Sequence, residues 1–324
     1  PRGDKTLSPL LSDKLENLML MCADHHKLID NPTTGPRDYP VDRLREMKRA
    51  HEEKIEKICG LFNVPKTEIV CFSSPIKGVT AVEIDYDLAA RAVLPSKQPG
   101  SSYGINLQVK SAYPYTSKEY WNDCYRQLKS SFDLYMRNPI IQRGNAAFSV
   151  FSVAPIPLII KLGELIGDKL PCDVYQKTRF PDTWEWQAKE LTNSFVVDVV
   201  KTDVTNGIVA LNISLTNDVN NDRILSAGEF EAIYKIKASA TGVDCIKSIE
   251  DLSAFWHTYQ GVLDEILNKH GAGCQIHLFP AMPVSAAFEV GRRYMLNTHP
   301  SVTIFDENNG FFETLKMGVN TDDR

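Results

Sequence analysis

The feature that most constrains this chain of 324 residues is an internal repeat of strand, proline turn and helix. The first copy spans residues 148–166 and the second spans 275–294. In both copies an apolar strand leads through a turn with two prolines into a helix that contains a glycine. Such self-similarity marks one supersecondary unit used twice. The repeat therefore predicts two related α/β units.

A separate strand that ends in small hydroxyl residues precedes each copy, at 68–74 and at 207–216. Strands separated by helices form mostly parallel sheets. Ligands of open α/β sheets bind beyond the carboxyl ends of the strands, where helix N-termini and free amides can meet phosphate. Alternatively, the prolines only set the strand-to-helix turns, as single prolines do. Repetition of the whole unit favours a ligand site at this edge.

Composition excludes several classes of protein. No run of about 18 apolar residues occurs, so no membrane span is expected. The seven cysteines lack the spacing of a disulfide framework, which favours a reducing cytoplasm. The net charge is −5, and residues 1–58 carry 11 basic and 11 acidic side chains. Any DNA contact must therefore come from local geometry.

Three helices stand out by apolar periodicity, beginning at Val41, at Thr116 and near Ser248. Gly60 is expected to end the first of them. After this helix the sequence becomes rich in segments with a β-strand pattern, which indicates a domain boundary. The domains are 1–60, a linker over 61–66, and 67–324, the last divided into units of about 67–190 and 191–324.

A cluster of metal-ligating residue types lies before the first helix. Cys22 and His25 are separated by two residues, so one turn can present both to a tetrahedral zinc ion. The adjacent His26 points elsewhere and can serve a second metal. Two further zinc ligands are needed, and the next histidine, His51, sits on the following helix. The missing pair is expected upstream of Pro1.

This segment resembles the HNH nuclease family in its zinc-containing treble-clef, ββα-metal form. The resemblance lies in residues 1–4, 17–22, 25–30 and 47–52. It implies that Asn17 orients the base-bearing loop and that His26 binds the catalytic divalent cation, Mg²⁺ or another. It also implies that Cys22 and His25 form half of a structural zinc site. The family's general-base histidine precedes the segment that corresponds to Pro1, so residues 1–324 alone are not expected to cut DNA.

Phosphodiester hydrolysis needs a positioned water, a base and a cation that stabilises the charge growing on the phosphate. The residue types of the cluster fit this chemistry in an α+β module that is incomplete here. The alternative is a zinc-stabilised treble clef without catalysis. We assign His51 and Glu52 to packing or to the solvated surface of their helix.

The rest of the chain resembles the SAVED domain, which is fused to effectors in bacterial cyclic-oligonucleotide-based antiphage signalling systems (CBASS). The resemblance lies in 151–158, in 162–163, in 175–176 with Arg179, in 184–186, in 278–284 and in 289–292. SAVED domains are regarded as two fused CARF-like Rossmann units. This α/β architecture agrees with the internal repeat.

A cyclic nucleotide presents phosphates and flat bases, so its receptor needs polar donors and aromatic or guanidinium faces. Ser73, Ser74 and Ser214 end strands. Arg179, Trp184 and Trp186 form a loop cluster that can stack on a base. The spacing of the two tryptophans also fits a strand with one ring in the core. The candidate contacts from the proline turns are Ala154, Pro155, Pro157, Phe279, Pro280, Met282 and Pro283.

Together these features predict a metal-dependent DNA endonuclease activated by a cyclic di- or trinucleotide, with a cGAMP isomer favoured. The ligand changes the packing of a homo-oligomer, a dimer that grows on activation, and its HNH modules then cut double-stranded DNA. One alternative is a constitutive restriction-type nuclease whose second half reads modified DNA. It predicts a basic face over 67–324, where the negative charge lies. The other is a non-catalytic nucleotide sensor with a degenerate zinc module.

Overall fold

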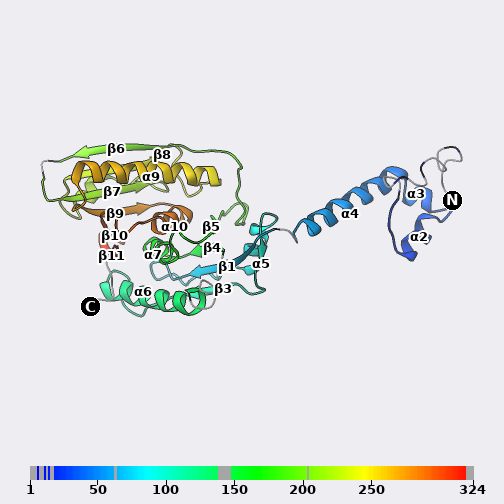
Figure 1. Cartoon of the computed structure of the whole chain (residues 1–324), viewed down its shortest axis with the longest axis horizontal. Helices are drawn as coiled ribbons and strands as arrows, with labels where there is room; N and C mark the ends of the chain where they lie inside the picture. Colours follow the sequence, from blue (N-terminus) through cyan, green and yellow to red (C-terminus); the bar gives the residue numbers. More distant parts are fainter. Residues whose placement is uncertain are drawn as a thin grey trace. The chain divides into compact units, whose positions relative to one another are not determined.

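The structure is a computed structural model. It describes residues 6, 11, 14, 18–61, 64–137, 147–202 and 204–318, without the side chains of 57–61. The chain divides into two compact units, Pro1–Val64 and Pro65–Arg324 (Figure 1). Of the helices within these described ranges, none combines the length and apolar character that crossing a lipid bilayer requires.

The first unit is helical over its described part. An extended segment at 18–22 leads into α2 (Ala23–Ile29), and α3 (Gly35–Asp38) is followed by the long helix α4 (Val41–Leu61). The prediction that Gly60 ends this helix is wrong, because α4 continues to Leu61. A glycine inside a helix costs only about 1 kcal/mol relative to alanine, so the helix tolerates it.

The second unit begins with a parallel sheet. Its strands are β1 (Lys66–Ser73), β2 (Gln98–Pro99), β3 (Ile105–Gln108), β4 (Phe148–Val153) and β5 (Cys172–Val174). Both β2 and β3 pair with one side of β1, and β4 and β5 follow on its other side. The connecting helices are α5 (Tyr86–Val93), α6 (Lys118–Phe132) with the short π-helix η2 (Asp133–Arg137), and α7 (Ile156–Ile166).

A six-stranded sheet follows in the order β11-β10-β9-β7-β8-β6. Its strands are β6 (Phe195–Lys201), β7 (Ile208–Ser214), β8 (Ala232–Ala238), β9 (Gln275–Ala281), β10 (Ser301–Glu307) and β11 (Phe311–Met317). The edge strands β6 and β11 are antiparallel to their neighbours, and the four central strands are parallel. The helices are α8 (Asn221–Leu225), α9 (Ile249–His270) and α10 (Val284–Arg292).

The two sheets repeat one topology, which confirms the predicted pair of α/β units. The spatial order β3-β1-β4-β5 of the first sheet has the same connections as β8-β7-β9-β10 of the second. In each repeat the first helix packs on one face of the sheet, and the next two pack on the other. One continuous hydrophobic core joins the helices α6, α7, α9 and α10 with both sheets, and α7 and α10 lie between the sheets (Figure 1).

The repeats meet where α7 crosses α10. A Cβ atom on Gly163 would lie 2.2 Å from the carbonyl oxygen of Phe288, and one on Gly291 would lie 1.8 Å from the carbonyl oxygen of Ile160. No side chain fits at these distances, so both glycines are required for the two backbones to touch. The glycine of each repeated helix thus has a packing role.

Hydrogen bonds fix the starts of the long helices. The Ser248 hydroxyl accepts from the backbone N–H of Asp251 at 2.9 Å, and the Asp251 carboxylate accepts from the backbone N–H of Ser248 at 3.2 Å. This capping box confirms the predicted start of α9. The cap of α6 is Ser117, which accepts from the N–H of Tyr120, so the helix begins one residue later than the Thr116 signal predicts.

Candidate functional site

The carboxyl edge of the first sheet brings together two segments that the sequence analysis singled out. Phe72 of β1 lies beside Ser152 of β4, and Ser73 lies beside Val153. The N–H of Ser74 donates to the carbonyl of Val153 at 3.1 Å. The hydroxyl-bearing end of β1 therefore lies next to the first proline turn, as the parallel sheet predicts.

Serine hydroxyls at this edge are buried. Ser73, Ser74 and Ser152 are each 2% exposed or less. The hydroxyls of Ser73 and Ser152 have no hydrogen-bond partner among the described residues. A buried polar group without a partner costs about 1–3 kcal/mol, so a polar atom of a ligand bound here would recover that energy. Ser152 was not predicted, although it is a polar residue inside an otherwise apolar strand.

The equivalent edge of the second sheet differs. The Ser214 hydroxyl donates to Asn212 Oδ1 at 2.8 Å and accepts from the N–H of Val219 at 3.0 Å. Lys235 donates to the carbonyl of Val219 at 2.7 Å and pairs with Asp218 at 2.6 Å. The loop after β7 is thus fastened over the strand end. Ser214 stays a predicted ligand contact, and in this structure its hydroxyl is bonded within its own chain.

The N-terminus of α7 offers few free amides. The N–H groups of Leu158 and Ile159 donate to the carbonyl of Pro155 at 3.0 and 3.2 Å. Pro157 has no N–H to give. The proline turn therefore consumes most of the donors that an anion would need.

The N-terminus of α10 is occupied by a side chain from the first repeat. Gln176 is buried, and its Oε1 accepts from the N–H of Ser285 at 3.1 Å and from its hydroxyl at 3.0 Å. These donors are not available to phosphate as the structure stands. Gln176 instead connects the end of β5 to the second proline turn.

Most of the proline-turn candidates are buried. Ala154, Pro155 and Pro157 of the first turn and Met282 and Pro283 of the second are buried, and Pro280 is partly exposed. Phe279 is fully buried and stacks on Phe305 at 4.6 Å in a cluster on the outer face of the second sheet. The Phe279 ring thus belongs to that core in this structure, and its ligand contact stays a prediction.

The aromatic residues of the loop after β5 differ in burial. Trp184 is 2% exposed and packs edge-on against Phe151 at 5.2 Å, so it is the tryptophan that packs in the core. Trp186 is partly buried against the main core. Arg179 is exposed. Its neighbour Phe180, which was not predicted, is 94% exposed.

A hydrogen-bonded turn holds Phe180 in this position. The N–H of Thr178 donates to the carbonyl of Thr183 at 3.0 Å, and its hydroxyl donates to the carbonyl of Pro181 at 3.1 Å. The turn therefore carries an exposed guanidinium group and an exposed aromatic ring on consecutive residues. The sequence signal available for Phe180 was its place beside Arg179 and before Pro181.

Side chains of the two repeats also meet at the end of β10. Lys77, in the turn after β1, lies 3.7 Å from Glu307, which Arg223 contacts at 3.1 Å. The hydroxyl of Tyr115 donates to Asp306, and burial raises the pKa of that carboxyl above its ordinary value. Together with the Gln176 bond to α10, these contacts put the carboxyl edges of both sheets on one side of the unit. Lys77 adds a cation close to the serine-bearing edge.

In the first unit, Cys22 and His25 converge. The Cys22 sulfur lies 3.0 Å from His25 Nδ1, and this hydrogen bond is the main reason that the pKa of the exposed thiol falls to about 7. In a tetrahedral zinc site these two atoms would lie about 3.5 Å apart, so a small rotation of the side chains would let them take two of its corners. No group of three histidine, cysteine, aspartate or glutamate side chains that could hold a metal occurs among the described residues.

His26 is the next residue on α2. Its Nδ1 lies 3.3 Å from an Asp30 carboxylate oxygen, and the side chain is largely exposed. A carboxylate on Nδ1 leaves Nε2 free to bind a cation, which is the usual arrangement of metal-binding histidines. Asn17, the other predicted catalytic residue, lies outside the described residues.

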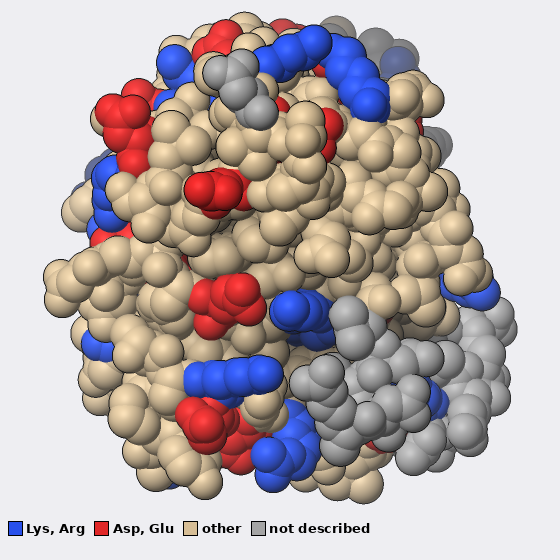
Figure 2. Space-filling view, turned by 90° about the vertical axis from the view of Figure 1, so that its left-hand side faces the viewer, with Lys and Arg blue, Asp and Glu red and all other residues tan. Residues whose placement is uncertain are grey.

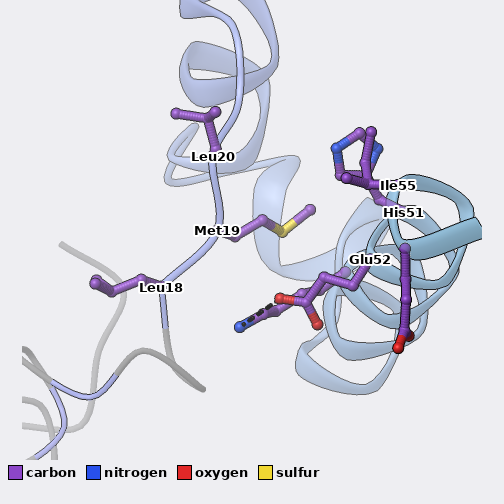
Figure 3. A pocket seen from close by; sticks show the side chains of 8 residues that line it. Leu18, Met19, Leu20, His51, Glu52 and Ile55 are labelled. Carbon is purple, nitrogen blue, oxygen red and sulfur yellow. Dashed lines mark ion pairs between the residues drawn. The ribbon is translucent and has the colours of Figure 1, made fainter. Parts of the chain in front are cut away.

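A hollow of 490 Å³ lies beside this segment, between residues 18–20 and helix α4. Its lining consists of Leu18, Met19, Leu20, Lys48, His51, Glu52, Ile55 and Glu56. Met19 points toward the helix, and Lys48 pairs with Glu52 at 3.2 Å (Figure 3). His51 and Glu52 are exposed, which confirms their assignment to the helix surface.

Comparison with known families now bears on the second unit. Residues 134–317, more than half of the chain, match the SMODS-associated and fused to various effectors sensor domain, SAVED. The chain belongs to the SAVED family. This confirms the resemblance of the second unit, while the HNH resemblance of the first lies outside the match and stays a prediction.

Solved SAVED/CARF-domain receptors are similar at low identity. The Cap4 receptor of Acinetobacter baumannii with the cyclic trinucleotide 2'3'3'-cAAA is 13% identical, with a TM-score of 0.49 over 85% of this chain and 56% of that one. The Cap4 receptor of Moraxella osloensis is 15% identical, with a TM-score of 0.41 over 83% and 52%. This SAVED chain thus spans little more than half of each receptor. The comparison with curated proteins found no match.

Proposed function

We propose that this SAVED chain senses a cyclic oligonucleotide and thereby controls an HNH nuclease module that cuts double-stranded DNA in antiphage defence. Membership of the SAVED family, with buried unpartnered serine hydroxyls at the carboxyl edge of its first sheet, is the observation that carries the proposal. A cyclic di- or trinucleotide has the phosphate and ribose oxygens that such hydroxyls can bind.

The first sheet supplies the polar contacts of the proposed site. Ser73 and Ser152 provide hydroxyl groups at the strand ends, and Lys77 provides a cation in the turn beyond Ser74. Arg179 and Phe180 provide a guanidinium group and a ring that can stack on a base. The carboxyl edge of the first sheet has hydroxyl groups without partners among the described residues, whereas the Ser214 hydroxyl at the edge of the second sheet is bonded. The ligand is therefore expected to contact the first sheet more than the second.

In the first unit, Cys22 and His25 would hold half of a structural zinc site, and His26 would hold the divalent cation, Mg²⁺ or another. The bound cation would neutralise charge on the phosphate and activate water. Asp30 would orient His26 through Nδ1. Asn17 keeps its proposed role in orienting the base-bearing loop.

Ligand control requires that the nucleotide binds one assembly state better than another. We propose that this chain forms a homo-oligomer whose packing the nucleotide changes. The restriction-type alternative predicts a basic face on the second unit. On the face drawn in Figure 2, lysine and arginine side chains lie in small groups among acidic ones, and most of the surface is uncharged.

Two readouts on the full-length protein, with the general-base histidine of its HNH module included, test the proposal, each with and without a panel of cyclic di- and trinucleotides. The first is the melting temperature, which one nucleotide should raise. The second is cleavage of plasmid DNA with Mg²⁺, which the same nucleotide should switch on. Cleavage without nucleotide would favour the constitutive nuclease. A thermal shift without cleavage in either condition would favour the non-catalytic sensor.

His26→Ala separates the two activities. Removing the imidazole should abolish cleavage. The nucleotide should still raise the melting temperature, because the proposed ligand site lies in the other unit. Loss of both responses would show that His26 has a structural role. Cys22→Ala is the companion variant, since it should lower the melting temperature of the first unit if the thiolate holds zinc.

A further inference from the structure

A carboxylate at the end of β10 contacts two cations that come from different repeats. Glu307 Oε2 lies 3.7 Å from Lys77 Nζ of the first repeat, and Glu307 Oε1 lies 3.1 Å from Arg223 Nη2 of the second. The three side chains are 38%, 43% and 52% exposed in that order. Two accessible cations that converge on one small anion also suit a phosphate group, whose oxygens accept from lysine and arginine.

This cluster of Lys77, Arg223 and Glu307 lies at the edge where the ligand site is proposed. Glu307 is the last residue of β10, and Arg223 belongs to α8 in the connection after β7. Lys77 lies three residues beyond Ser74, at the hydroxyl-bearing end of β1. Because ligands of open α/β sheets bind beyond the carboxyl ends of the strands, a nucleotide phosphate at this edge can reach cations of both repeats.

The turn that carries Lys77 is fixed by hydrogen bonds and is unfavourable for lysine. Ile76 and Val79 exchange two backbone hydrogen bonds, at 3.2 and 2.9 Å, around the two-residue turn of Lys77 and Gly78. Both turn residues have positive φ, 49° and 82°, as in a type I′ turn. Asparagine or glycine is preferred at the first position, because other side chains are strained there. A lysine held in this conformation favours a functional role for its ammonium group.

Arg223 and Glu307 are also positioned by their neighbours. The Arg223 guanidinium group lies over the ring of Phe311, 5.3 Å from its centroid. The backbone N–H of Glu307 donates to Asp306 Oδ1 at 2.7 Å, which fixes the end of the strand. The Glu307 carboxylate, in contrast, is held only by partly exposed ion pairs, and such pairs contribute little to the free energy of unfolding. An anion that binds both cations can therefore replace it without unfolding the site.

We propose that the Glu307 carboxylate occupies the place of a ligand phosphate, and that a phosphate of the bound cyclic nucleotide displaces it from Lys77 and Arg223. This inference rests on the proposed function and adds an internal competitor to it. The exchanged phosphate then contacts both repeats, whereas the displaced carboxylate moves into solvent. Because only the fraction of molecules with Glu307 displaced can bind the phosphate, the competition lowers the apparent affinity and sets the nucleotide concentration at which the sensor responds.

Isothermal titration calorimetry on the full-length protein tests this proposal with the panel of cyclic di- and trinucleotides, including cyclic GMP–AMP and cyclic triadenylate. Glu307→Gln should bind the same nucleotide about three- to tenfold more tightly, because the competing side chain has lost its charge. Asp222→Asn is the matched control, since it removes one negative charge from the exposed residue next to Arg223 and should change the affinity less than about twofold. Unchanged melting temperatures without nucleotide show that both variants are folded.

Variants of the cations distinguish displacement from simple repulsion between Glu307 and the nucleotide. Lys77→Asn suits the positive φ of the turn and should weaken binding by about three- to tenfold, as should Arg223→Gln. In the Lys77→Asn protein, Glu307→Gln should tighten binding less than it does alone, because the carboxylate then competes for one cation instead of two. Repulsion alone predicts the same gain in both proteins.

Three results would overturn the role of Glu307 and leave the proposed function standing. They are a gain from Glu307→Gln no larger than that from Asp222→Asn, a gain that Lys77→Asn leaves unchanged, and cation variants that bind with the affinity of the unmodified protein. If neither the unmodified protein nor Glu307→Gln binds any member of the panel, the proposed function and this inference both fail.

Discussion

At the scale of residues, two serines of β4 differ in what their hydroxyls do. Ser149 and Ser152 are both fully buried. The Ser149 hydroxyl lies 2.9 Å from the Thr67 hydroxyl, whereas the Ser152 hydroxyl has no partner among the described residues. The pair therefore separates a hydroxyl that stabilises the fold from one that is free for a ligand.

Ser152→Ala should leave the free energy of unfolding unchanged or raise it, because the variant removes a buried polar group without breaking a hydrogen bond. Ser149→Ala should lower it by about 1 kcal/mol, since the Thr67 hydroxyl loses this hydrogen bond and keeps only the longer one to the carbonyl of Ala147. Urea denaturation followed by circular dichroism measures both. The activating nucleotide should raise the melting temperature of Ser152→Ala less than that of Ser149→Ala. Equal destabilisation by the two variants would mean that Ser152 is bonded within the fold.

Phe180 gives the second residue-scale prediction. Phe180→Ala should weaken nucleotide binding by about 1–3 kcal/mol if the ring stacks on a base, with no loss of stability because the ring is 94% exposed. Isothermal titration calorimetry measures the affinity. Tyr103→Ala is the control, because Tyr103 is 89% exposed in the loop before β3. An affinity that Phe180→Ala leaves unchanged would remove this residue from the proposed site.

At the scale of elements, the crossing of α7 and α10 depends on glycine. Gly291→Ala should destabilise the protein by about 1–3 kcal/mol or more, because its Cβ would lie 1.8 Å from the carbonyl oxygen of Ile160. Gly261→Ala in α9 is the control, since no atom lies within 4 Å of the added Cβ. It should stabilise the helix by up to about 1 kcal/mol. A Gly291→Ala variant with the stability of the Gly261→Ala variant would show that the helices can separate without cost.

The connection between the repeats depends on one carboxylate. Asp251 accepts from the backbone N–H groups of Thr192, Asn193, Lys247 and Ser248 at 2.6–3.2 Å. Burial alone would raise the pKa of Asp251, but these hydrogen bonds outweigh it and hold the pKa below its ordinary value. The carboxylate fastens the segment that leads from the first repeat into the second to the start of α9.

Asp251→Asn should lower the free energy of unfolding at neutral pH by about 1.5–3 kcal/mol, the usual contribution of hydrogen bonds to a charged group. Because the folded-state pKa is lowered, this stabilisation is present above the ordinary aspartate pKa and is lost as the pH falls through the folded value. Urea denaturation at several pH values should therefore show the two proteins converging in acid. A gap that persists unchanged at low pH would contradict the role of the charge.

At the scale of the whole molecule, local sequence patterns predicted the strands and helices. They did not predict which side chains stay exposed or without a hydrogen-bond partner. The proline turns and glycines of 148–166 and 275–294 predicted the repeat because they act on the backbone where they stand. The difference between Ser73 and Ser214 arises from the loop after β7, which folds back over the strand end. The sequence could not show this because the bonds depend on tertiary contacts.

Tertiary contacts also decide the burial of the aromatic residues in the loop after β5. Trp184 and Phe180 are both large apolar residues in one loop, and their burial differs because Trp184 packs against Phe151 of β4 whereas Phe180 is 94% exposed. The site in the first unit was read from the spacing of Cys22 and His25, which one helical turn decides locally. Local geometry is thus predictable from sequence in this chain, whereas exposure at the edges is not.

The two repeats also meet through a second, partly buried carboxylate, with the opposite pH dependence. Burial raises the pKa of Asp306, although the hydroxyl of Tyr115 donates to it. Because the folded-state pKa is raised, the protonated Asp306 side chain contributes to the free energy of unfolding. This contribution is present below the ordinary aspartate pKa and is lost as the pH rises through the folded-state pKa. At neutral pH the charged carboxylate therefore carries a desolvation cost that an amide would not.

Asp306→Asn keeps an oxygen that can accept from Tyr115 and removes the charge. This variant should equal or exceed the unmodified protein in free energy of unfolding at neutral pH, and the difference should shrink as the pH falls toward about 4. The same urea series that serves Asp251→Asn measures it, so the two variants provide opposite signs in one experiment. Destabilisation of Asp306→Asn at neutral pH as large as that of Asp251→Asn would show that the Asp306 charge holds the repeats together, for example through its attraction to Lys77.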